Sequence, residues 1–139
     1  MISLTYLSTA TEPFSDAALR DLLGRCREKN HDVDLTGMLL YVGGHFIQTL
    51  EGDSSVVDET FARIEQDPRH RDVFIALREV ADARTFSDWS MGFESLTPED
   101  ASSLPGFNDY LANRTMSDED RAKLGRAGIF HRVFRDRMR

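Results

Sequence analysis

The sequence predicts an α+β fold in which two helices cover one face of a mixed sheet. Apolar alternation typical of strands and apolar spacing typical of helices take turns over residues 1–96, in the order β-α-β-β-α-β-β. The pair Gly43-Gly44 directly joins two of the strand patterns, which is typical of a two-residue hairpin. With 139 residues and 40% hydrophobic content, the chain is long enough to bury a core. The economical packing of these elements is a ferredoxin-like sandwich.

The ends of the elements carry their own signals. Ser15 precedes the first helical pattern, and its hydroxyl is a preferred N-cap. Pro68 disfavours helical backbone at Asp67, so the second helix should end there. These patterns place strands at residues 2–8, 34–42, 45–51, 72–83 and 88–95, and helices at residues 16–30 and 52–67.

The character of the chain changes after residue 96. Pro98, Pro105 and Gly106 interrupt it, and a Gly-weakened helical pattern follows from Ser117. We therefore expect a first domain over residues 1–96 and a helical C-terminal extension over residues 97–139. The apolar stripe of that extension covers either the open face of the sheet or the surface of a partner.

Charge is distributed unevenly along the chain. The net charge is −7, but residues 114–139 carry eight Lys or Arg against four Asp or Glu, which leaves +4 there and −11 on the remainder. An acidic body disfavours general binding to nucleic acid. The basic tail either contacts an acidic partner or folds back onto its own acidic domain.

The sequence also bears on location. No apolar run approaches the roughly 20 residues that span a bilayer. The strand pattern begins at Ile2 without a basic leader segment, and Cys26 is the only cysteine, which excludes an internal disulfide. We expect a cytoplasmic protein without a membrane partner.

Signatures of catalysis and metal binding are weak. The sequence contains no Gly-rich phosphate loop, nucleophile elbow or cysteine pair, and its four histidines lack metal-ligand spacing. Glu51, Asp53 and Glu59 are interpreted as solvated turn and helix-start residues rather than as a carboxylate cluster. We therefore expect neither an enzyme nor a metal site.

Polar residues on apolar faces are the more informative feature. Gln48 and Tyr6 each share a strand face with large apolar residues, and Asn30 continues the apolar stripe of the first helix. Arg63 and Asp67 are four residues apart, a spacing that favours an ion pair. One interpretation gives each group a local partner: Asn30 caps its helix, Tyr6 reaches solvent and Gln48 satisfies a strand edge. The other places a planar polar ligand in the groove between sheet and helices.

Five segments resemble, in order and spacing, the BLUF domain, a family that senses blue light using FAD. The resemblance covers residues 2–94 and implies a ferredoxin-like α+β sandwich that holds the isoalloxazine ring of the flavin between two helices. The segments are LTYLSTA (4–10), CREKNHDVDLTGMLLY (26–41), HFIQTLEG (45–52), IEQDPRHRDV (64–73) and FSDWSMGF (86–93).

The resemblance implies a role for individual residues. Tyr6 matches the electron donor to the excited flavin. Gln48 matches the glutamine that lies between that tyrosine and two groups of the flavin ring, the N5 nitrogen and the C4 carbonyl. Asn30 matches the asparagine that hydrogen-bonds the polar edge of the ring. Trp89 and Met91 match the last-strand pair that is tied to signal output. Four further residues fall in the region that lines the flavin pocket: Arg63, Asp67, Arg69 and His70.

Departures from the family pattern are small. Leu35 replaces the isoleucine that usually precedes Thr36-Gly37, and Asp53 replaces the proline that often follows the Glu-Gly turn. The implied function is a blue-light switch in which Tyr6 reduces bound FAD and Gln48 relays the proton. Its signal passes through the extension, a change of homo-oligomeric state or a separate protein partner. The alternative is a ferredoxin-like interaction or small-ligand module without a photocycle. A flavin enzyme is disfavoured, because the sequence has no nicotinamide-binding fingerprint.

Overall fold

The computed structural model describes residues 1–87, 90–96 and 119. Its helices and strands follow the predicted order, and the predicted ferredoxin-like α+β class is confirmed. The expected extension, residues 97–139, lies outside the described residues apart from Glu119. The elements are β1 (Ile2–Ala10), α1 (Asp16–Asp32), β2 (Thr36–Val42), β3 (His45–Gly52), α2 (Ser54–Glu65), β4 (His70–Val80) and β5 (Gly92–Leu96).

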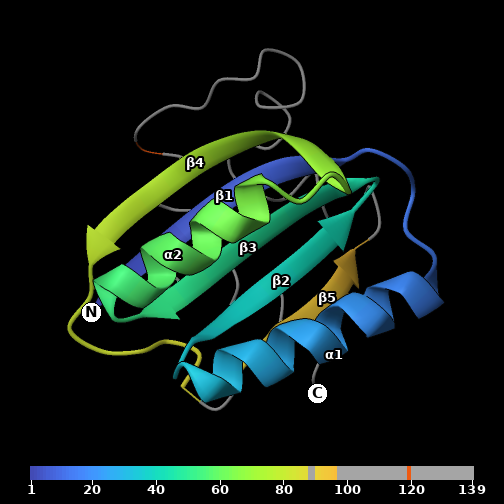
Figure 1. Cartoon of the computed structure of the whole chain (residues 1–139). Coiled ribbons are helices and arrows are strands. Elements are labelled where there is room, and N and C mark those ends of the chain that lie inside the picture. Colours follow the sequence, from blue (N-terminus) through green and yellow to red (C-terminus); the bar gives the residue numbers. More distant parts are fainter. Residues whose placement is uncertain (88–89, 97–118, 120–139) are drawn as a thin grey trace.

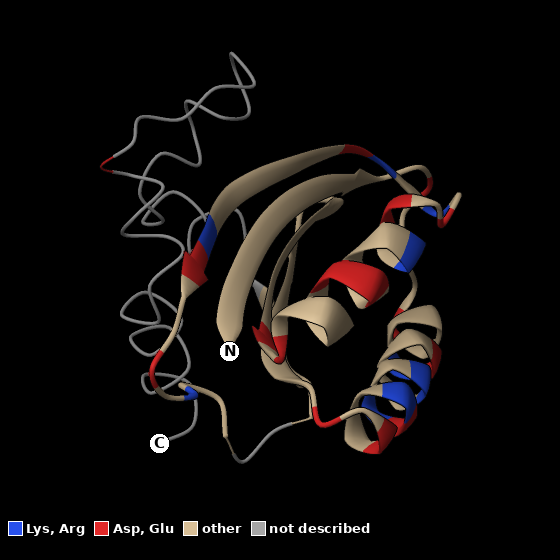
Figure 2. Ribbon diagram, turned by 60° about the vertical axis from the view of Figure 1, so that its left-hand side comes forward, with Lys and Arg blue, Asp and Glu red and all other residues tan. Residues whose placement is uncertain are grey.

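The five strands form one mixed sheet in the order β4-β1-β3-β2-β5. All neighbouring pairs are antiparallel except β2 and β5, which run parallel. Both helices lie on the same face of the sheet, with α2 over the β1 and β3 side and α1 beside β2 and β5 (Figure 1). The charged residues gather on the helices and at strand ends, whereas the middle of the sheet is almost free of them (Figure 2). The strand order places β3, which carries Gln48, at the centre of the sheet.

The hairpin between β2 and β3 has the predicted two-residue form. Val42 pairs with His45 across it. Gly43 and Gly44 have φ angles of 54° and 83°, a left-handed conformation at both positions that only glycine adopts readily. The hairpin therefore fixes the register of β2 against β3.

Several element bounds differ from the expectation. β5 begins at Gly92 rather than at residue 88, and Trp89 lies outside the described residues. β4 begins at His70, earlier than expected, because this residue pairs with Ala10 at the end of β1. The differences concern strand ends, whose position depends on pairing with a distant strand. Among the described residues, no helix has the length and apolar character that crossing a membrane requires.

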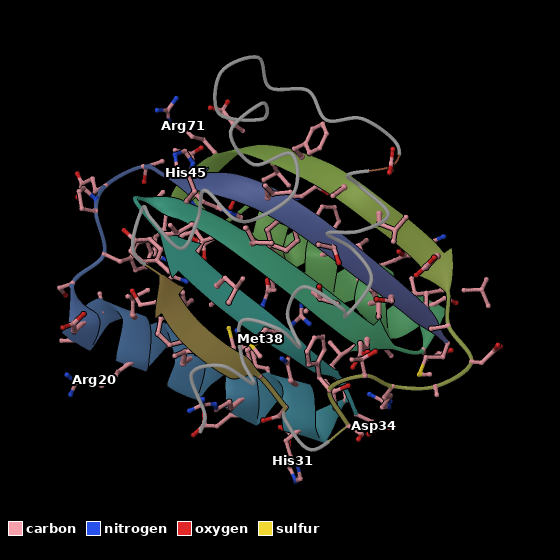
Figure 3. All side chains as sticks on the ribbon, turned by 180° about the vertical axis from the view of Figure 1, so that it is seen from behind. Arg20, His31, Asp34, Met38, His45 and Arg71 are labelled. Atoms are coloured by element: carbon pink, nitrogen blue, oxygen red, sulfur yellow. The ribbon has the colours of Figure 1, made fainter. Side chains whose placement is uncertain are left out.

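The middle of the sheet is buried on both faces. On the helix side, Leu4, Leu39 and Leu50 form a core with both helices, and Tyr6 and Gln48 belong to the same face. On the opposite face, Met38 is fully buried, and Figure 3 shows it from that side. The central strands therefore bury both of their faces, and any polar group on them needs a partner.

Gly37 on β2 is required by close approach. A Cβ atom there would lie 2.0 Å from the backbone oxygen of Thr49 and 3.2 Å from the methyl group of Met91.

Gly37→Ala should therefore lower the free energy of unfolding by about 1–3 kcal/mol, because the backbone must move. The control is Gly24→Ala. Gly24 lies in α1, and a Cβ atom at this position would have no neighbouring atom within 4 Å. We expect this substitution to raise stability by about 0.5–1 kcal/mol. Urea unfolding measures both, and equal stabilities would contradict this account.

Candidate functional site

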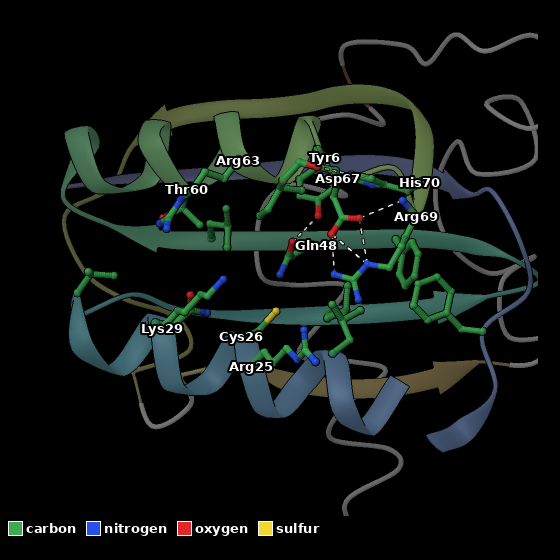
Figure 4. Close-up of a pocket in the computed structure, with 18 residues that line it drawn as sticks. Tyr6, Arg25, Cys26, Lys29, Gln48, Thr60, Arg63, Asp67, Arg69 and His70 are labelled. Carbon is green, nitrogen blue, oxygen red and sulfur yellow. Dashed lines mark hydrogen bonds and ion pairs between the residues drawn. The ribbon is translucent and has the colours of Figure 1, made fainter. Parts of the chain in front are cut away.

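A cavity of about 210 Å³ lies between α1 and α2, above the middle of the sheet. Figure 4 shows Arg25, Cys26 and Lys29 entering it from α1 and Thr60 and Arg63 from α2, with Gln48 between the helices. The lining combines an apolar floor with a few polar groups, which is typical of a small-molecule site. The lining residues are Tyr6, Phe14, Leu22, Arg25, Cys26, Lys29, Asn30, Val33, Leu39, Phe46, Gln48, Leu50, Thr60, Arg63, Ile64, Asp67, Arg69 and His70.

Tyr6 and Gln48 form a buried pair in the floor of the cavity. They are direct cross-strand partners on β1 and β3, and each is 3% exposed. The Tyr6 hydroxyl donates a hydrogen bond to Oε1 of Gln48. The Nε2 group of Gln48 points to the sulfur of Met91, 3.5 Å away. Tyr6 therefore does not reach solvent and Gln48 does not serve a strand edge, because β3 is the central strand.

The environment keeps the Tyr6 phenol protonated. Burial raises the pKa of Tyr6 far above its ordinary value, and the nearby Cys26 and Asp67 raise it further. The ring packs against Phe61, with centroids 5.3 Å apart, and against His70 at 6.3 Å. Tyr6 is thus held as a neutral hydrogen-bond donor in a fixed orientation.

Asn30 and Arg27 on α1 hold the two residues that precede β5. The Asn30 side chain donates to the backbone oxygen of Ser90 at 2.8 Å, and Nε of Arg27 donates to that of Met91 at 2.9 Å. Asn30 is 4% exposed, and its backbone carbonyl, not its side chain, accepts the bond from Leu35 that follows the helix. Its side chain therefore joins the cavity wall to the start of β5.

The expected ion pair between Arg63 and Asp67 is wrong. α2 ends at Glu65, so Asp67 lies beyond the helix and turns to Arg69 instead. The Arg69 guanidinium donates to both carboxylate oxygens, at 3.0 and 2.6 Å, and its backbone N–H donates at 3.0 Å. These bonds lower the pKa of Asp67 and raise the pKa of Arg69. Arg63 lines the cavity but joins no ion pair among the described residues.

His70 uses both ring nitrogens within the protein. Nε2 contacts the backbone oxygen of Ile64, which only accepts, so this nitrogen carries a proton. Nδ1 lies 2.8 Å from the hydroxyl of Ser8, which is fully buried on β1. His70 therefore ties the end of α2 to β1 and lines the cavity with its ring.

Glu51 contradicts the interpretation of the acidic residues as solvated. Asp53 and Glu59 are exposed as expected, but Glu51 is only 2% exposed. Its carboxylate accepts from the Thr36 hydroxyl at 3.0 Å and from the backbone N–H groups of Thr85 and Phe86 at 2.7 and 2.9 Å. The carboxylate is buried because β3 is covered on both faces and these donors satisfy it.

Sequence reasoning missed other residues that line the cavity. Cys26 and Lys29 share the stripe of α1 that carries Asn30, and this spacing was a usable signal. Thr60 precedes Arg63 by one helical turn, and its buried hydroxyl has no hydrogen-bond partner among the described residues. Within the same part of the chain, no group of His, Cys, Asp and Glu residues is arranged to hold a metal ion.

Comparison with known sequences identifies a family. The model described as "Sensors of blue-light using FAD" matches residues 1–92. The chain is 36% identical over 118 residues to photoactivated adenylate cyclase subunit beta of Euglena gracilis, covering 84% of this chain and 14% of that protein. It is 34% identical over 117 residues to subunit alpha, covering 84% and 11%. The chain thus spans about one-seventh or less of the length of these curated relatives.

Solved structures give the same likeness. A dark-state structure of BlrB, described as a BLUF protein, is 34% identical, with a TM-score of 0.72 and coverage of 92% of this chain and 94% of that one. BlrP1 of Klebsiella pneumoniae with FMN and cyclic diGMP is 34% identical, with a TM-score of 0.63 and coverage of 68% and 25%. The similarity to BlrB extends over nearly the whole length of both chains.

Asp67 should make stability depend on pH. Its pKa in the folded protein lies below the ordinary 3.8, so the ionised carboxylate stabilises the fold above that pH, and the contribution is lost as pH falls through the lower folded-state value. Asp67→Asn should lower the free energy of unfolding by about 1 kcal/mol at neutral pH. The difference should shrink below pH 3.8. Urea unfolding at several pH values measures it.

The matched control is Asp58→Asn, which breaks an ion pair with Arg78 whose side chains are both about half exposed. Solvent screens such a pair, so we expect a smaller effect. A loss of stability in Asp67→Asn that is the same at every pH would contradict this role of the carboxylate.

Proposed function

The chain belongs to the BLUF family of blue-light sensors that use FAD, and on this premise we propose that Tyr6 and Gln48 are its photochemical residues. The observation that carries the proposal is the buried hydrogen bond from the Tyr6 hydroxyl to Oε1 of Gln48, with Nε2 of the same amide directed at Met91. A single amide thereby contacts a phenol at one end and the segment before β5 at the other. The role of this BLUF domain is sensing rather than catalysis.

The residues of the cavity fit a flavin. Apolar side chains supply the faces on which a planar ring packs, and Thr60 has a buried hydroxyl that still needs a partner. One N–H of the Asn30 amide is engaged by Ser90, so its second N–H and its acceptor, Oδ1, remain for the ring. The charged lining is mainly basic, which suits the diphosphate of FAD. We assign cofactor binding to Asn30, Gln48, Arg63, Asp67, Arg69 and His70.

Hydrogen bonds within the protein determine which groups of His70 and Arg69 remain available to the cofactor. His70 spends both nitrogens on Ser8 and Ile64, so it contacts the cofactor through its ring. Asp67 holds Arg69 in a bidentate pair, which leaves the remaining guanidinium N–H groups of Arg69 as donors. These residues orient the cofactor without rearrangement of their own.

The chemistry of the switch follows from the two residue types. When bound, FAD supplies blue-light absorption and an excited state that accepts an electron. With FAD bound, Tyr6 would give up that electron, and its phenolic proton would move along the existing hydrogen bond to Oε1 of Gln48. On charge recombination an electron and a proton would return to Tyr6, and the neutral Gln48 amide would be left with its donor and acceptor ends exchanged, by rotation or tautomerisation. The changed hydrogen bond to the ring shifts absorption to the red until the dark state returns.

The signal leaves the site through the residues before β5. Exchange of the amide ends alters the contact between Gln48 and Met91, and Trp89 lies two residues earlier in the chain. We propose that domain 1–96 acts in the cytoplasm and passes this change to the extension, residues 97–139, to a homo-oligomer contact or to an effector protein. Relatives of this domain are parts of photoactivated adenylate cyclases, so a nucleotide cyclase is a reasonable kind of effector.

Gln48→Leu should retain bound flavin but lose the reversible red shift, because leucine has the size of glutamine without a donor or acceptor. Absorption spectra before and after blue light measure the shift, and the flavin content of the purified protein serves as the internal reference. A normal photocycle in this variant would overturn the assignment of Gln48.

Tyr6→Phe should likewise abolish the photocycle, because it removes the hydroxyl that donates to Gln48 while keeping the ring against Phe61. Tyr41→Phe is the matched control. Tyr41 lies on β2, does not line the cavity, and accepts a bond from the backbone of Phe14. We expect this variant to keep a red shift like that of the original protein. Loss of the shift in both variants would show that the effect is not specific to Tyr6.

A further inference from the structure

Glu51 lies on the face of the sheet opposite the cavity, and none of the proposed photochemical steps uses it. We propose that the Glu51 carboxylate is a positioning residue for the light response, which anchors the chain before Met91 and thereby sets the rate of return to the dark state. This inference rests on the proposed function.

The first step is that the carboxylate fixes backbone rather than a single side chain. Oε2 accepts from the N–H of Thr85 at 2.7 Å, and Oε1 accepts from the N–H of the next residue, Phe86, at 2.9 Å. Bonds from N–H groups to a carboxylate are stronger than bonds between neutral groups. The Phe86 side chain is itself 2% exposed. The anchor therefore holds two consecutive residues of the connection between β4 and β5.

Arg84 reinforces the same anchor. Its guanidinium donates to the Thr36 hydroxyl at 2.9 Å and to the backbone oxygen of Glu51 at 3.1 Å. Its other terminal nitrogen donates to the backbone oxygen of Asp34 at 2.8 Å. The Thr36 hydroxyl in turn donates to the Glu51 carboxylate at 3.0 Å. Residues 84–86 are thus fixed to the ends of β2 and β3.

The second step is the short distance along the chain from this anchor to the switch. Three residues separate Phe86 from Ser90, so their Cα atoms lie at most about 14 Å apart. Ser90 and Met91 are held by Asn30 and Arg27, and Met91 meets Gln48. Any movement of Met91 therefore occurs on a short tether whose far end Glu51 holds.

The third step concerns β3, which carries both groups. Gln48 and Glu51 are three residues apart on this strand and face opposite sides of the sheet. Return to the dark state requires the contacts of Ser90 and Met91 to re-form. While residues 85 and 86 are fixed, only a short segment is free when these contacts re-form. Without the anchor a longer segment is free, so re-forming the contacts costs more conformational entropy. A weaker anchor should therefore slow recovery without changing the light-driven step.

The test uses the full chain with bound FAD and the variant Glu51→Gln, which keeps the shape but turns one acceptor into an NH2 group that faces a backbone N–H. We expect an unchanged dark spectrum and red-shift amplitude, with dark recovery slower by at least about threefold. A second readout, hydrogen exchange in the dark, should show faster exchange of the Thr85 and Phe86 amides. Thr36→Val removes the hydroxyl that donates to Glu51 and accepts from Arg84, but leaves both backbone bonds to the carboxylate. It should shift both readouts in the same direction by less, and it serves if Glu51→Gln does not fold.

The control is Ile2→Val, which removes one buried methyl group from the helix side of β1, opposite Gly52, and alters none of the hydrogen bonds of the anchor. It costs about 0.5–1.5 kcal/mol of stability. Its recovery rate should equal that of the original protein. Unchanged recovery in Glu51→Gln and Thr36→Val, or an equal slowing in Ile2→Val, overturns the inference. Absence of any photocycle in the original protein would instead overturn the proposed function, so the two failures are distinguishable.

Discussion

The hydrogen bond between Tyr6 and Gln48 is the interaction on which the rest of the site depends. Both groups are buried, so each needs a partner, and the register of β1 against β3 places them directly opposite. Packing of Tyr6 against Phe61 fixes the phenol, and the sulfur of Met91 receives the other end of the amide. The sheet thus holds a polar pair in an apolar core, in the floor of the cavity between α1 and α2.

The two faces of β3 carry different functional groups. The face toward the helices carries Gln48 and the cavity, and the opposite face carries Glu51 and its bonds to Thr85 and Phe86. In the proposed function, the contacts of the chain before β5 with both faces would carry a local change at Gln48 out of the site.

Several of the polar groups around the cavity are held by bonds within the protein. His70 is held by Ser8 and by the end of α2, Arg69 is held by Asp67, and Asn30 is held by Ser90. Such preorganisation lowers the entropy that binding must offset. In the proposed switch, these fixed surroundings would let a small rearrangement of one amide produce a response.

The sequence by itself determined the order of the elements, the Gly43-Gly44 hairpin and the inward direction of Gln48, because each depends on periodicity or backbone preference within a few residues. It also supplied the resemblance that identified the family. Only the tertiary structure decided that Asp67 pairs with Arg69 and that Glu51 is buried. The pairing of Asp67 follows from the end of α2 at Glu65, which turns this residue toward Arg69. The burial of Glu51 depends on which strands flank β3 and on bonds from residues 85 and 86, far along the chain.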